Sequence, residues 1–384
     1  MHFLVIGAGK QGQACALDLL EHTAGSVTLS DKYDVPLQSF MERFARDPRL
    51  KRVRLDLEDD AAVRAAMNGV QSVLSAAPYY FNEKLAAMSL EAGAHFADLG
   101  GNTEIVFNQK KLDARAAAKN VSVIPDCGLA PGMVNILAGE GIRRLDRTDS
   151  VRIYVGGLPQ HPKPPLNYMV VYSLEGALDY YTTESWVLRG GKPTKVEALS
   201  EVEPVEFAAP LGTLEAFHTA GGISTLPFAW EGRIATMEYK TLRYPGHAAI
   251  MRPIRELGLL DDEPIAVNGD GHKVSPRQMF IATVSPKLTQ PHGRDLVALR
   301  VEVRGSRAGK PAGWRWEMVD RYDERRGVTA MMRTTGYSLA VTGIMQVDGR
   351  IAARGVKTPD ECVPAAEYIP ELKKRGVVIE EQPI

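Results

Sequence analysis

The first 125 residues alternate short apolar runs with stretches of helical periodicity. The run Phe3–Ile6 is apolar throughout and ends at Gly7, as is typical of a strand buried on both faces of a parallel sheet. Further strand-like runs lie at 26–30, 53–57, 71–77, 94–98 and 121–124, and helical stretches lie at 10–21, 37–47, 60–67, 82–92 and 110–119. Six strands joined by crossover helices predict a doubly wound parallel sheet of the Rossmann type.

Local signals predict where several helices begin and end. Asn82 is expected to cap the start of the helix at 82–92, because its side chain can accept a free backbone N–H. Gly93 and Asn120 are expected to end their helices, since both residue types tolerate the left-handed conformation of a helix stop. Pro131 is expected to open a helix that runs to about Leu145.

Between 151 and 330 the strand-like runs change character and alternate apolar with polar residues. Leu299–Arg304 and Trp314–Met318 show this most clearly, and the glycine-rich stretch 305–313 is predicted to be the loop between them. Such alternation favours a mostly antiparallel sheet with one polar face. We therefore predict an α/β fold with a Rossmann domain over 1–125 and a second α+β domain over 126–334, built on a mixed, largely antiparallel sheet. Helices at 335–346 and 364–375, within the C-terminal segment 335–384, are expected to pack back on the first domain.

Composition narrows the class of protein. The 384 residues carry 46 Lys and Arg against 47 Asp and Glu, so the net charge of −1 gives no global field that would attract nucleic acid or an anionic membrane. No apolar run approaches the roughly 20 residues that span a bilayer, and the N-terminus lacks the features of a signal peptide. Cys15, Cys127 and Cys362 lie far apart, which argues against a disulfide scaffold or a Cys-rich metal site. We expect a cytoplasmic protein without a metal.

The segment Gly7-Ala8-Gly9-Lys10-Gln11-Gly12 is a G-x-G-x-x-G motif between a buried strand and a helix. In that context Gly7 permits the turn, Gly9 lets the backbone approach a pyrophosphate, and Gly12 lets the helix pack close to the strand. Asp31 ends the next strand 19 residues after Gly12, where a carboxylate binds the ribose hydroxyls of NAD and repels the extra phosphate of NADP. The neighbouring Lys32 could partly tolerate that phosphate.

In open α/β sheets, ligands bind outside the carboxyl ends of the strands. The residues that follow the predicted strands are therefore expected to contact the cofactor: Asp56, Leu57, Ala76, Ala77, Pro78 and Leu99. Asp98 and Asp126 are carboxylates that would face the nicotinamide. Asp is also common after strands as a turn former or helix cap, and Asp126 fits that structural role better than Asp98 does.

Four segments of the second domain resemble a known family: Tyr154–Pro159, Pro164–Tyr168, Glu215–Thr219 and Thr241–His247. Together with Asp98–Gly101, Pro125–Gly132 and Lys373–Val377 they look like the saccharopine dehydrogenase-related family, and within it most like the NAD-dependent L-lysine 6-dehydrogenases. The resemblance covers nearly the whole chain. It implies a Rossmann domain, a mixed-sheet domain that shapes the active site and subunit contacts, and oxidation of an amine carbon with NAD.

Lysine as substrate would make defined chemical demands. Arg243 is the candidate for the α-carboxylate, because a guanidinium matches its geometry, although an Arg in a strand is usually a surface residue. His218 and His247 could bind substrate or move protons, or be structural. Tyr79 could hydrogen-bond the substrate or simply pack. Asp98 is the best-placed base for the ε-ammonium; alternatively, Asp98 only binds the ammonium while hydroxide or His218 takes the proton.

Two other functional classes stay open on the sequence. An imine reductase of the saccharopine or carboxynorspermidine type would join an aldehyde to an amine, and its substrate would need additional Arg or Lys residues. A dinucleotide-binding regulator would keep the fold without turnover. In each case a homodimer or larger symmetric assembly is the default expectation.

Overall fold

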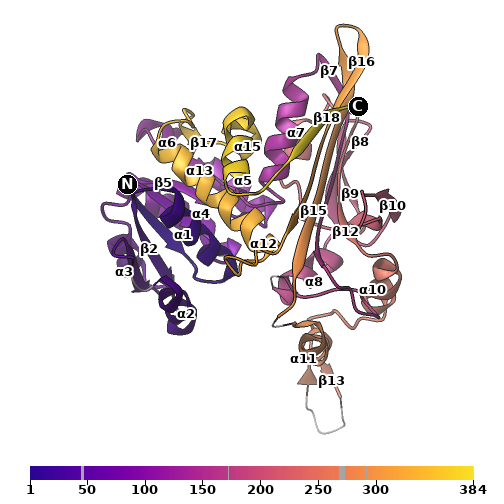
Figure 1. The fold of residues 1–384 in the computed structure, drawn as a ribbon, viewed down its shortest axis with the longest axis horizontal. Helices are drawn as coiled ribbons and strands as arrows, with labels where there is room; N and C mark the ends of the chain where they lie inside the picture. Colours follow the sequence, from indigo (N-terminus) through magenta and orange to yellow (C-terminus); the bar gives the residue numbers. More distant parts are fainter. Residues whose placement is uncertain (45–46, 172, 268–272, 291) are drawn as a thin grey trace.

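The computed structural model describes residues 1–44, 47–171, 173–267, 273–290 and 292–384. Two sheets organise the chain, and Figure 1 shows them side by side, with helices of the C-terminal segment and α7 between them. The predicted fold class is confirmed: a parallel Rossmann sheet is followed by a domain on a mixed sheet.

The first sheet has seven strands in the order β17-β6-β5-β4-β1-β2-β3, and every described pair is parallel. Its strands are β1 (His2–Ile6), β2 (Ser26–Asp31), β3 (Leu50–Arg54), β4 (Ser72–Ser75), β5 (His95–Asp98), β6 (Ser122–Ile124) and β17 (Gly355–Val356). Its helices are α1 (Lys10–His22), α2 (Asp34–Phe44), α3 (Asp60–Ala66), α4 (Asn82–Ala92), α5 (Thr103–Lys110) and α6 (Asp113–Ala118). The short 3₁₀ turn η1 (Tyr79–Phe81) precedes α4.

Several local predictions for this domain need correction. Strand β3 begins at Leu50, three residues before the predicted run 53–57, and ends at Arg54. Leu55 lies beyond the strand end but is buried, so its apolar side chain extended the predicted run past the strand. The helix predicted at 110–119 corresponds to α6, whereas α5, which precedes it, was missed because it buries only Val106 and Gln109. Asn82 does not cap α4: its Oδ1 accepts a hydrogen bond from Ser75. Residues 45 and 46 of the helix predicted at 37–47 lie outside the described residues.

Of the other predicted helix ends, two are confirmed and one differs. Gly93 and Asn120 do end helices in the left-handed region, with φ of 72° and 56°. The helix after Pro131, α7 (Met133–Arg143), begins two residues later than expected, because residues 128–132 form a turn closed by the N–H of Met133 on the carbonyl of Gly128.

The second sheet has nine strands, of which seven form the path β10-β11-β12-β7-β15-β16-β18 while β8 and β9 extend from β12. Only the β12–β7 pair among the described pairs of this sheet is parallel. The strands are β7 (Arg147–Pro159), β8 (Ser185–Arg189), β9 (Lys192–Val196), β10 (Glu203–Glu206), β11 (Thr213–His218), β12 (Thr236–Arg243), β15 (Asp295–Arg307), β16 (Lys310–Arg321) and β18 (Glu380–Pro383). Helices α8 (Leu174–Thr182), α9 (Leu226–Ala229) and α10 (His247–Glu256) connect them.

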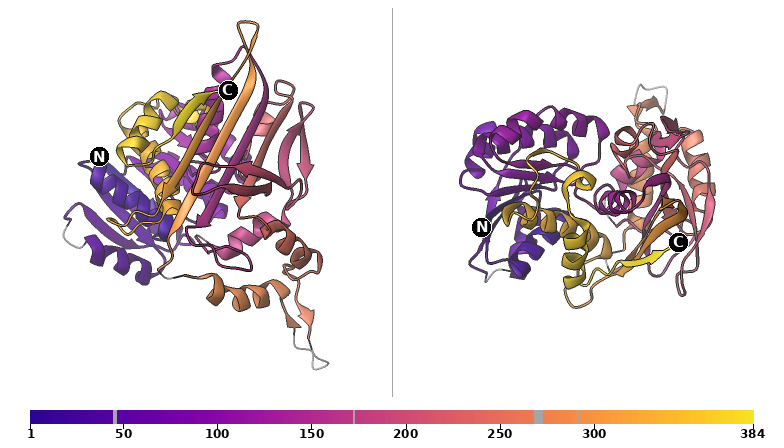
Figure 2. Two further views of the ribbon diagram at one scale, coloured as in Figure 1. Left: turned by 45° about the vertical axis from the view of Figure 1, so that its right-hand side comes forward. Right: turned by 90° about the horizontal axis from the view of Figure 1, so that it is seen from above.

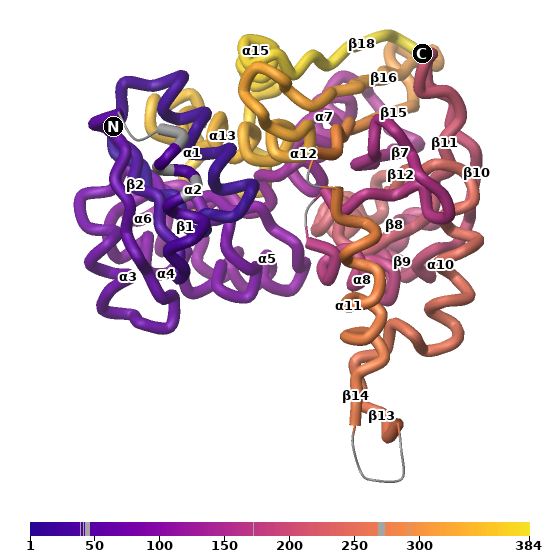
Figure 3. The backbone as a smooth tube through the Cα atoms, turned by 60° about the horizontal axis from the view of Figure 1, so that its bottom comes forward, coloured from indigo at the N-terminus to yellow at the C-terminus, as the bar shows by residue number. Residues whose placement is uncertain are grey.

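The hairpin of β15 and β16 is longer than its sequence pattern indicates. The two strands pair from Leu296 with Arg321 out to Arg307 with Lys310, so most of the predicted loop 305–313 is strand and the turn is only Ala308 and Gly309. Glycines 305 and 313 weakened the strand signal, yet both lie where a neighbouring backbone leaves no room for a side chain. Figure 2 shows the length of these two strands. Figure 3 shows that α11 (Pro276–Leu288) and the small hairpin of β13 (Ile265–Ala266) and β14 (Lys273–Val274) project from the body.

The C-terminal segment returns to the first domain and then leaves it again. It runs through α12 (Ala330–Met332), a π-helical turn (Arg333–Tyr337), α13 (Ser338–Val347), β17, α14 (Pro359–Cys362) and α15 (Ala365–Lys374). Strand β17 then extends the first sheet, and β18 pairs with β16 of the second sheet. Both sheets therefore depend on the last 55 residues, 330–384.

A buried ion pair fastens this segment to helix α1. Arg375 and Asp18 are 1% and 0% exposed in their side chains, and the guanidinium Nε donates to both carboxylate oxygens at 2.7 and 2.9 Å. Arg375 Nη1 also donates to Glu371 at 2.6 Å. Because both charges are removed from water, each is tolerated only while its partner is present.

We predict that Arg375→Met lowers the free energy of unfolding by about 3–5 kcal/mol, because it removes the permanent cation from the buried Asp18 carboxylate and leaves only His22 beside it. Urea unfolding followed by circular dichroism measures this. The matched control is Lys374→Met, whose side chain is 65% exposed and pairs with Glu371 on the surface; it is expected to change stability by less than about 1 kcal/mol. Equal stability of the two variants would contradict the anchoring role.

Candidate functional site

A cleft of about 550 Å³ opens at the carboxyl ends of β1, β2 and β4, and we call it the dinucleotide cleft. It contains the predicted residues Gly7, Gly9, Asp31, Lys32, Asp56 and Leu57, together with Ala76, Ala77 and Pro78. A side chain at Gly12 would collide with the carbonyl of Gly7, whereas one at Gly9 would meet no protein atom within 4 Å. The loop is therefore tight where the helix packs and open where a pyrophosphate would lie.

Asp31 holds the glycine loop in place as well as facing the cleft. Its Oδ2 accepts the N–H of Ala8 at 2.7 Å, and its Oδ1 accepts the N–H of Tyr33 at 2.9 Å. Lys32, which could have tolerated a phosphate, pairs with Asp56 at 3.0 Å. The backbone N–H of Glu58 and the Lys32 ammonium lower the pKa of Asp56, so it is ionised at neutral pH. Glu58 also lines the cleft. The acids Asp31, Asp56 and Glu58 outnumber the single cation Lys32, so the net charge of the cleft is negative.

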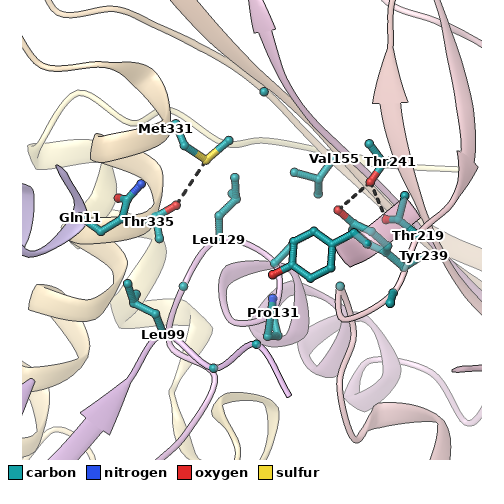
Figure 4. Close-up of a pocket in the computed structure, with 18 of the residues that line it drawn as sticks. Gln11, Leu99, Leu129, Pro131, Val155, Thr219, Tyr239, Thr241, Met331 and Thr335 are labelled. Atoms are coloured by element: carbon teal, nitrogen blue, oxygen red, sulfur yellow. Dashed lines mark hydrogen bonds between the residues drawn. The ribbon is translucent and has the colours of Figure 1, made fainter. Parts of the chain in front are cut away.

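A second hollow of about 250 Å³ lies between the two domains, and we call it the inter-domain cavity. Figure 4 shows its walls. Gln11, Leu99, Gly100 and Gly101 come from the first domain, and Gly128–Pro131 form the turn before α7. The second domain supplies Tyr180, Thr219, Tyr239, Thr241 and Arg243, and the C-terminal segment supplies Met331 and Thr335. Leu99 and Gln11, both predicted for the cofactor, lie here rather than in the dinucleotide cleft, whereas Lys10 lines neither.

Strand alternation on β12 aims three side chains at this cavity. Tyr239, Thr241 and Arg243 share one face of the strand, while Lys240 faces away and pairs with Glu203 at 2.9 Å. Arg243 is 5% exposed, so it is not the surface residue that its position in a strand would ordinarily indicate. Its Nε donates to the Tyr181 hydroxyl at 3.2 Å, and its guanidinium lies over the Tyr168 ring at 5.0 Å. Tyr239 and Thr241 were missed, although the same alternation could have identified them.

His247 lies behind Arg243 and not in the cavity wall. Its Nε2 is 3.0 Å from the Tyr181 hydroxyl, and its Nδ1 is 3.1 Å from the carbonyl of Leu166. Burial first, and then the nearby Arg243 charge, lower its pKa to about 3, so it is neutral at physiological pH. A neutral ring that donates to Leu166 accepts from Tyr181, and Tyr181 in turn accepts from Arg243. This arrangement orients Arg243, so the binding role predicted for His247 is indirect.

His218 lies outside the cavity. Its Nδ1 is 3.1 Å from the carbonyl of Tyr239 and its Nε2 is 3.1 Å from Glu201, and burial lowers its pKa. In the described part of the chain, Glu201, His218 and Glu238 form the one group with the spacing of metal ligands. Arg189 donates to both of these carboxylates at 2.8 Å, so the group forms an ion-pair network. The structure therefore gives His218 no contact with the cavity.

Asp98 and Asp126 lie together beneath the cavity wall, and both are 1% exposed. Asp98 accepts three hydrogen bonds, from the N–H groups of Gly100 and Asp126 and from Gln109. Burial raises its pKa to about 6 although these donors oppose the shift. Asp98 thus has the contacts of a turn residue, and its predicted catalytic role stays a prediction.

Asp126 differs from Asp98 in its hydrogen bonding. Neither carboxylate oxygen has a hydrogen-bond partner of normal geometry in the described residues, and the backbone is in the left-handed region at φ 62°. Burial raises its pKa to about 8; the neighbouring Ser224 hydroxyl opposes the shift and the charges of Asp98 and Asp360 add to it. Oδ1 occupies the place where a side chain at Gly100 would be, so the glycine keeps this carboxyl beside the cavity. A carboxyl of this kind can exchange a proton near neutral pH.

The site and the fold together define a class: a dinucleotide-binding oxidoreductase with a Rossmann domain, a mixed-sheet domain and a cavity between them. Residues 3–124 match the saccharopine dehydrogenase NADP binding domain, and residues 128–377 match the saccharopine dehydrogenase C-terminal domain. The chain therefore belongs to the saccharopine dehydrogenase family, and the family predicted from the second-domain motifs is confirmed.

Known relatives are distant in sequence but similar in fold. The chain is 21% identical to the Saccharomyces cerevisiae saccharopine dehydrogenase [NADP(+), L-glutamate-forming] over 99% of both chains. It is 24% identical to the mitochondrial alpha-aminoadipic semialdehyde synthase of Mus musculus over 75% of its own length, but it spans only 32% of that protein.

Two solved structures show the same fold. Apo saccharopine dehydrogenase (L-Glu forming) from Saccharomyces cerevisiae aligns with a TM-score of 0.82 at 19% identity over 100% of this chain and 99% of that one. The homospermidine synthase from Legionella pneumophila in complex with NAD aligns with a TM-score of 0.69 at 12% identity, over 99% and 91%. No helix in the described ranges is both long and apolar enough to span a membrane.

Breaking the Lys32–Asp56 ion pair is expected to change the cofactor preference. Asp56→Asn removes a negative charge and releases the Lys32 ammonium toward the position of a 2′-phosphate, so NADPH binding is expected to tighten severalfold while NADH binding changes little. Quenching of protein fluorescence by each cofactor measures both dissociation constants. Asp34→Asn is the control, because Asp34 is an exposed acid on α2 that does not line the cleft. An unchanged NADPH affinity in the Asp56 variant would mean that Lys32 does not reach the ribose.

Proposed function

We propose that this chain is an NAD-dependent amine dehydrogenase that oxidises the terminal amine carbon of L-lysine. The products are the 6-semialdehyde, which cyclises to 1-piperideine-6-carboxylate, and ammonia. The observation that supports this most is the charge of the inter-domain cavity: among its described lining residues, Arg243 alone is charged.

A single buried cation suits a substrate with a single carboxylate. Saccharopine carries several carboxylates, each of which needs a cation or several N–H donors when it leaves water. The hydroxyl groups of Thr219, Thr241 and Tyr239 supply neutral acceptors for an α-ammonium, and Thr219 and Thr241 already lie 2.7 Å apart. This cavity therefore favours an amino acid such as lysine over saccharopine.

The acids of the dinucleotide cleft support NAD as the cofactor. Asp31 lies at the ribose-reading position, and Asp56 both neutralises Lys32 and adds its own charge against a 2′-phosphate. NAD, when bound, supplies the acceptor for the hydride that leaves the amine carbon. The glycine loop, with its open space at Gly9 and the free N–H groups at the start of α1, would hold the pyrophosphate.

The reaction also requires a base. An ammonium must lose one proton before hydride leaves its carbon, and the ε-ammonium of free lysine has a pKa near ~10.4. Loss of that proton and of the hydride leaves an iminium, which water converts to the aldehyde and ammonium. Asp126 has a pKa of about 8, and neither of its oxygens accepts a hydrogen bond of normal geometry from the described residues, so it is the carboxyl that can accept the proton beside the cavity. Asp98 holds the backbone turn that positions it.

The decisive experiment is substrate turnover. The full-length protein is mixed with NAD and L-lysine, L-saccharopine or other amines, and NADH is followed by its absorbance. Lysine is expected to be oxidised with formation of ammonia and a cyclic imine. Turnover of saccharopine alone would assign the chain to the saccharopine-type enzymes, and saturable NADH binding without turnover of any amine would indicate a regulator.

Arg243→Ala is expected to weaken apparent lysine binding by roughly 10- to 100-fold, which corresponds to the 1.5–3 kcal/mol of a hydrogen bond to a charged group. NADH affinity should stay the same, because Arg243 does not line the dinucleotide cleft. Steady-state kinetics and cofactor titration measure the two effects. Arg233→Ala is the control, since Arg233 lies on the surface over Trp230. Native-like lysine affinity in the Arg243 variant would remove it from the binding site.

Turnover should rise with pH through about 8, because Asp126 accepts a proton only as a carboxylate and is protonated below its raised pKa. Asp126→Asn is expected to reduce kcat by roughly 10²- to 10⁴-fold and to remove this rise. Asn tolerates the left-handed backbone at this position, so the fold is expected to persist. Asp98→Asn is the comparison variant: if it removes the rise while Asp126→Asn keeps it, Asp98 is the base.

A further inference from the structure

A second hollow of about 540 Å³ adjoins the inter-domain cavity, and we call it the outer chamber. The two share Gly101, Tyr180, Ala220 and Gly222 as common wall, so they are neighbouring compartments of one cleft. Tyr79, the predicted substrate-binding tyrosine, lines the outer chamber and not the inner cavity. L-lysine bound between Arg243 and the nicotinamide position would leave this chamber without a ligand group.

The charge of the outer chamber disfavours an anion. Its one described basic lining residue, Lys195, pairs with Glu184 at 3.2 Å. The N–H groups at the start of α5 are also occupied, because Asn102 Oδ1 accepts those of Glu104 and Ile105. A carboxylate or phosphate would therefore find no free cation among the described lining residues.

Acceptors and aromatic surfaces, in contrast, are available. Glu104 has no ion-pair partner in the described residues, whereas Asp179, the third acid of the wall, is held by Arg277. Ser224 is 5% exposed and lines the chamber. Its hydroxyl neighbours Asp126 and accepts no hydrogen bond of normal geometry from the described residues. Tyr79 and Tyr180 add the aromatic surfaces on which an ammonium group is stabilised.

We propose that the outer chamber binds a primary ammonium group at the end of an alkyl chain. Glu104 supplies the counter-charge, Ser224 accepts one N–H, and the tyrosines contact the methylene groups next to the nitrogen. The substrate class then includes chains that react in the inter-domain cavity and carry a second amine into the outer chamber. This proposal rests on the proposed function only for the part of the ligand that lies in the inter-domain cavity.

The test uses the full-length protein saturated with NADH, in which no oxidation takes place. Calorimetric titration with 1,5-diaminopentane is compared with n-pentylamine, which has one ammonium group, and, in the Arg243→Ala variant that lacks the cation of the inter-domain cavity, with glutarate, which is a dianion. The diamine is expected to bind at least 10-fold more tightly than either compound. Glu104→Gln is expected to remove most of that difference, and Ser224→Ala part of it. Glu231→Gln, which removes an exposed acid outside the chamber, should bind the diamine as the native protein does.

Equal binding of pentylamine and the diamine, tighter binding of glutarate, or native diamine affinity in both chamber variants would overturn the proposal. The result is independent of lysine turnover. Diamine binding that depends on Glu104 in a protein that does not oxidise lysine would reject the proposed function and support the chamber. Lysine turnover without selective diamine binding would support the proposed function and reject the outer chamber as an ammonium site.

Discussion

The site depends on one close contact, that between helix α1 and the π-helical turn Arg333–Tyr337. Gly336 packs so tightly on α1 that a side chain there would lie 2.6 Å from the carbonyl of Gln11 and from the Cβ of Ala14. On the other side of the turn, Asp295 at the start of β15 accepts the N–H groups of Ala330 and Met331 at 2.7 and 2.9 Å. The returning chain thereby joins the glycine loop to the second sheet, and Gln11, Met331 and Thr335 form one wall of the cavity. This contact therefore helps to hold the two halves of the site face to face.

Burial sets the chemistry of the groups around this cavity. It holds His247 neutral, and a neutral imidazole can accept from Tyr181 and so orient Arg243. It also makes Asp126 a much weaker acid than an exposed aspartate. Both effects require that water be excluded and that no opposite charge lie close by. The exposed pair of Lys32 and Asp56 shows the contrary case, in which neighbouring donors keep a carboxylate ionised.

The sequence allowed much of the first domain to be predicted, because each of its signals is local. Continuous apolar runs gave the strands, and the glycine motif with Asp31 gave most of the dinucleotide cleft. Errors occurred where tertiary contacts outweighed the local pattern. Asn82 bonds to Ser75 instead of capping its helix, and Gly305 and Gly313 lie inside strands because a neighbouring backbone is too close for any side chain. Helix α5 was missed since little of it is buried.

By itself, then, the sequence determined the fold class, the family motifs and the identity of the nucleotide-binding loop, since these are written in residues that are neighbours along the chain. The tertiary structure alone decided which polar residues share a cavity. Arg243 and Gln11 are 232 positions apart but line the same inter-domain cavity. His218 and His247, which are closer to Arg243 in sequence, lie outside it. Strand alternation turns adjacent residues to opposite faces, and only the packing of the two sheets shows which face is the site. The hydrogen bonding of Asp126 is likewise a property of its surroundings. Its carboxylate accepts no hydrogen bond of normal geometry from the residues that the structure describes, whereas Asp98 next to it accepts three.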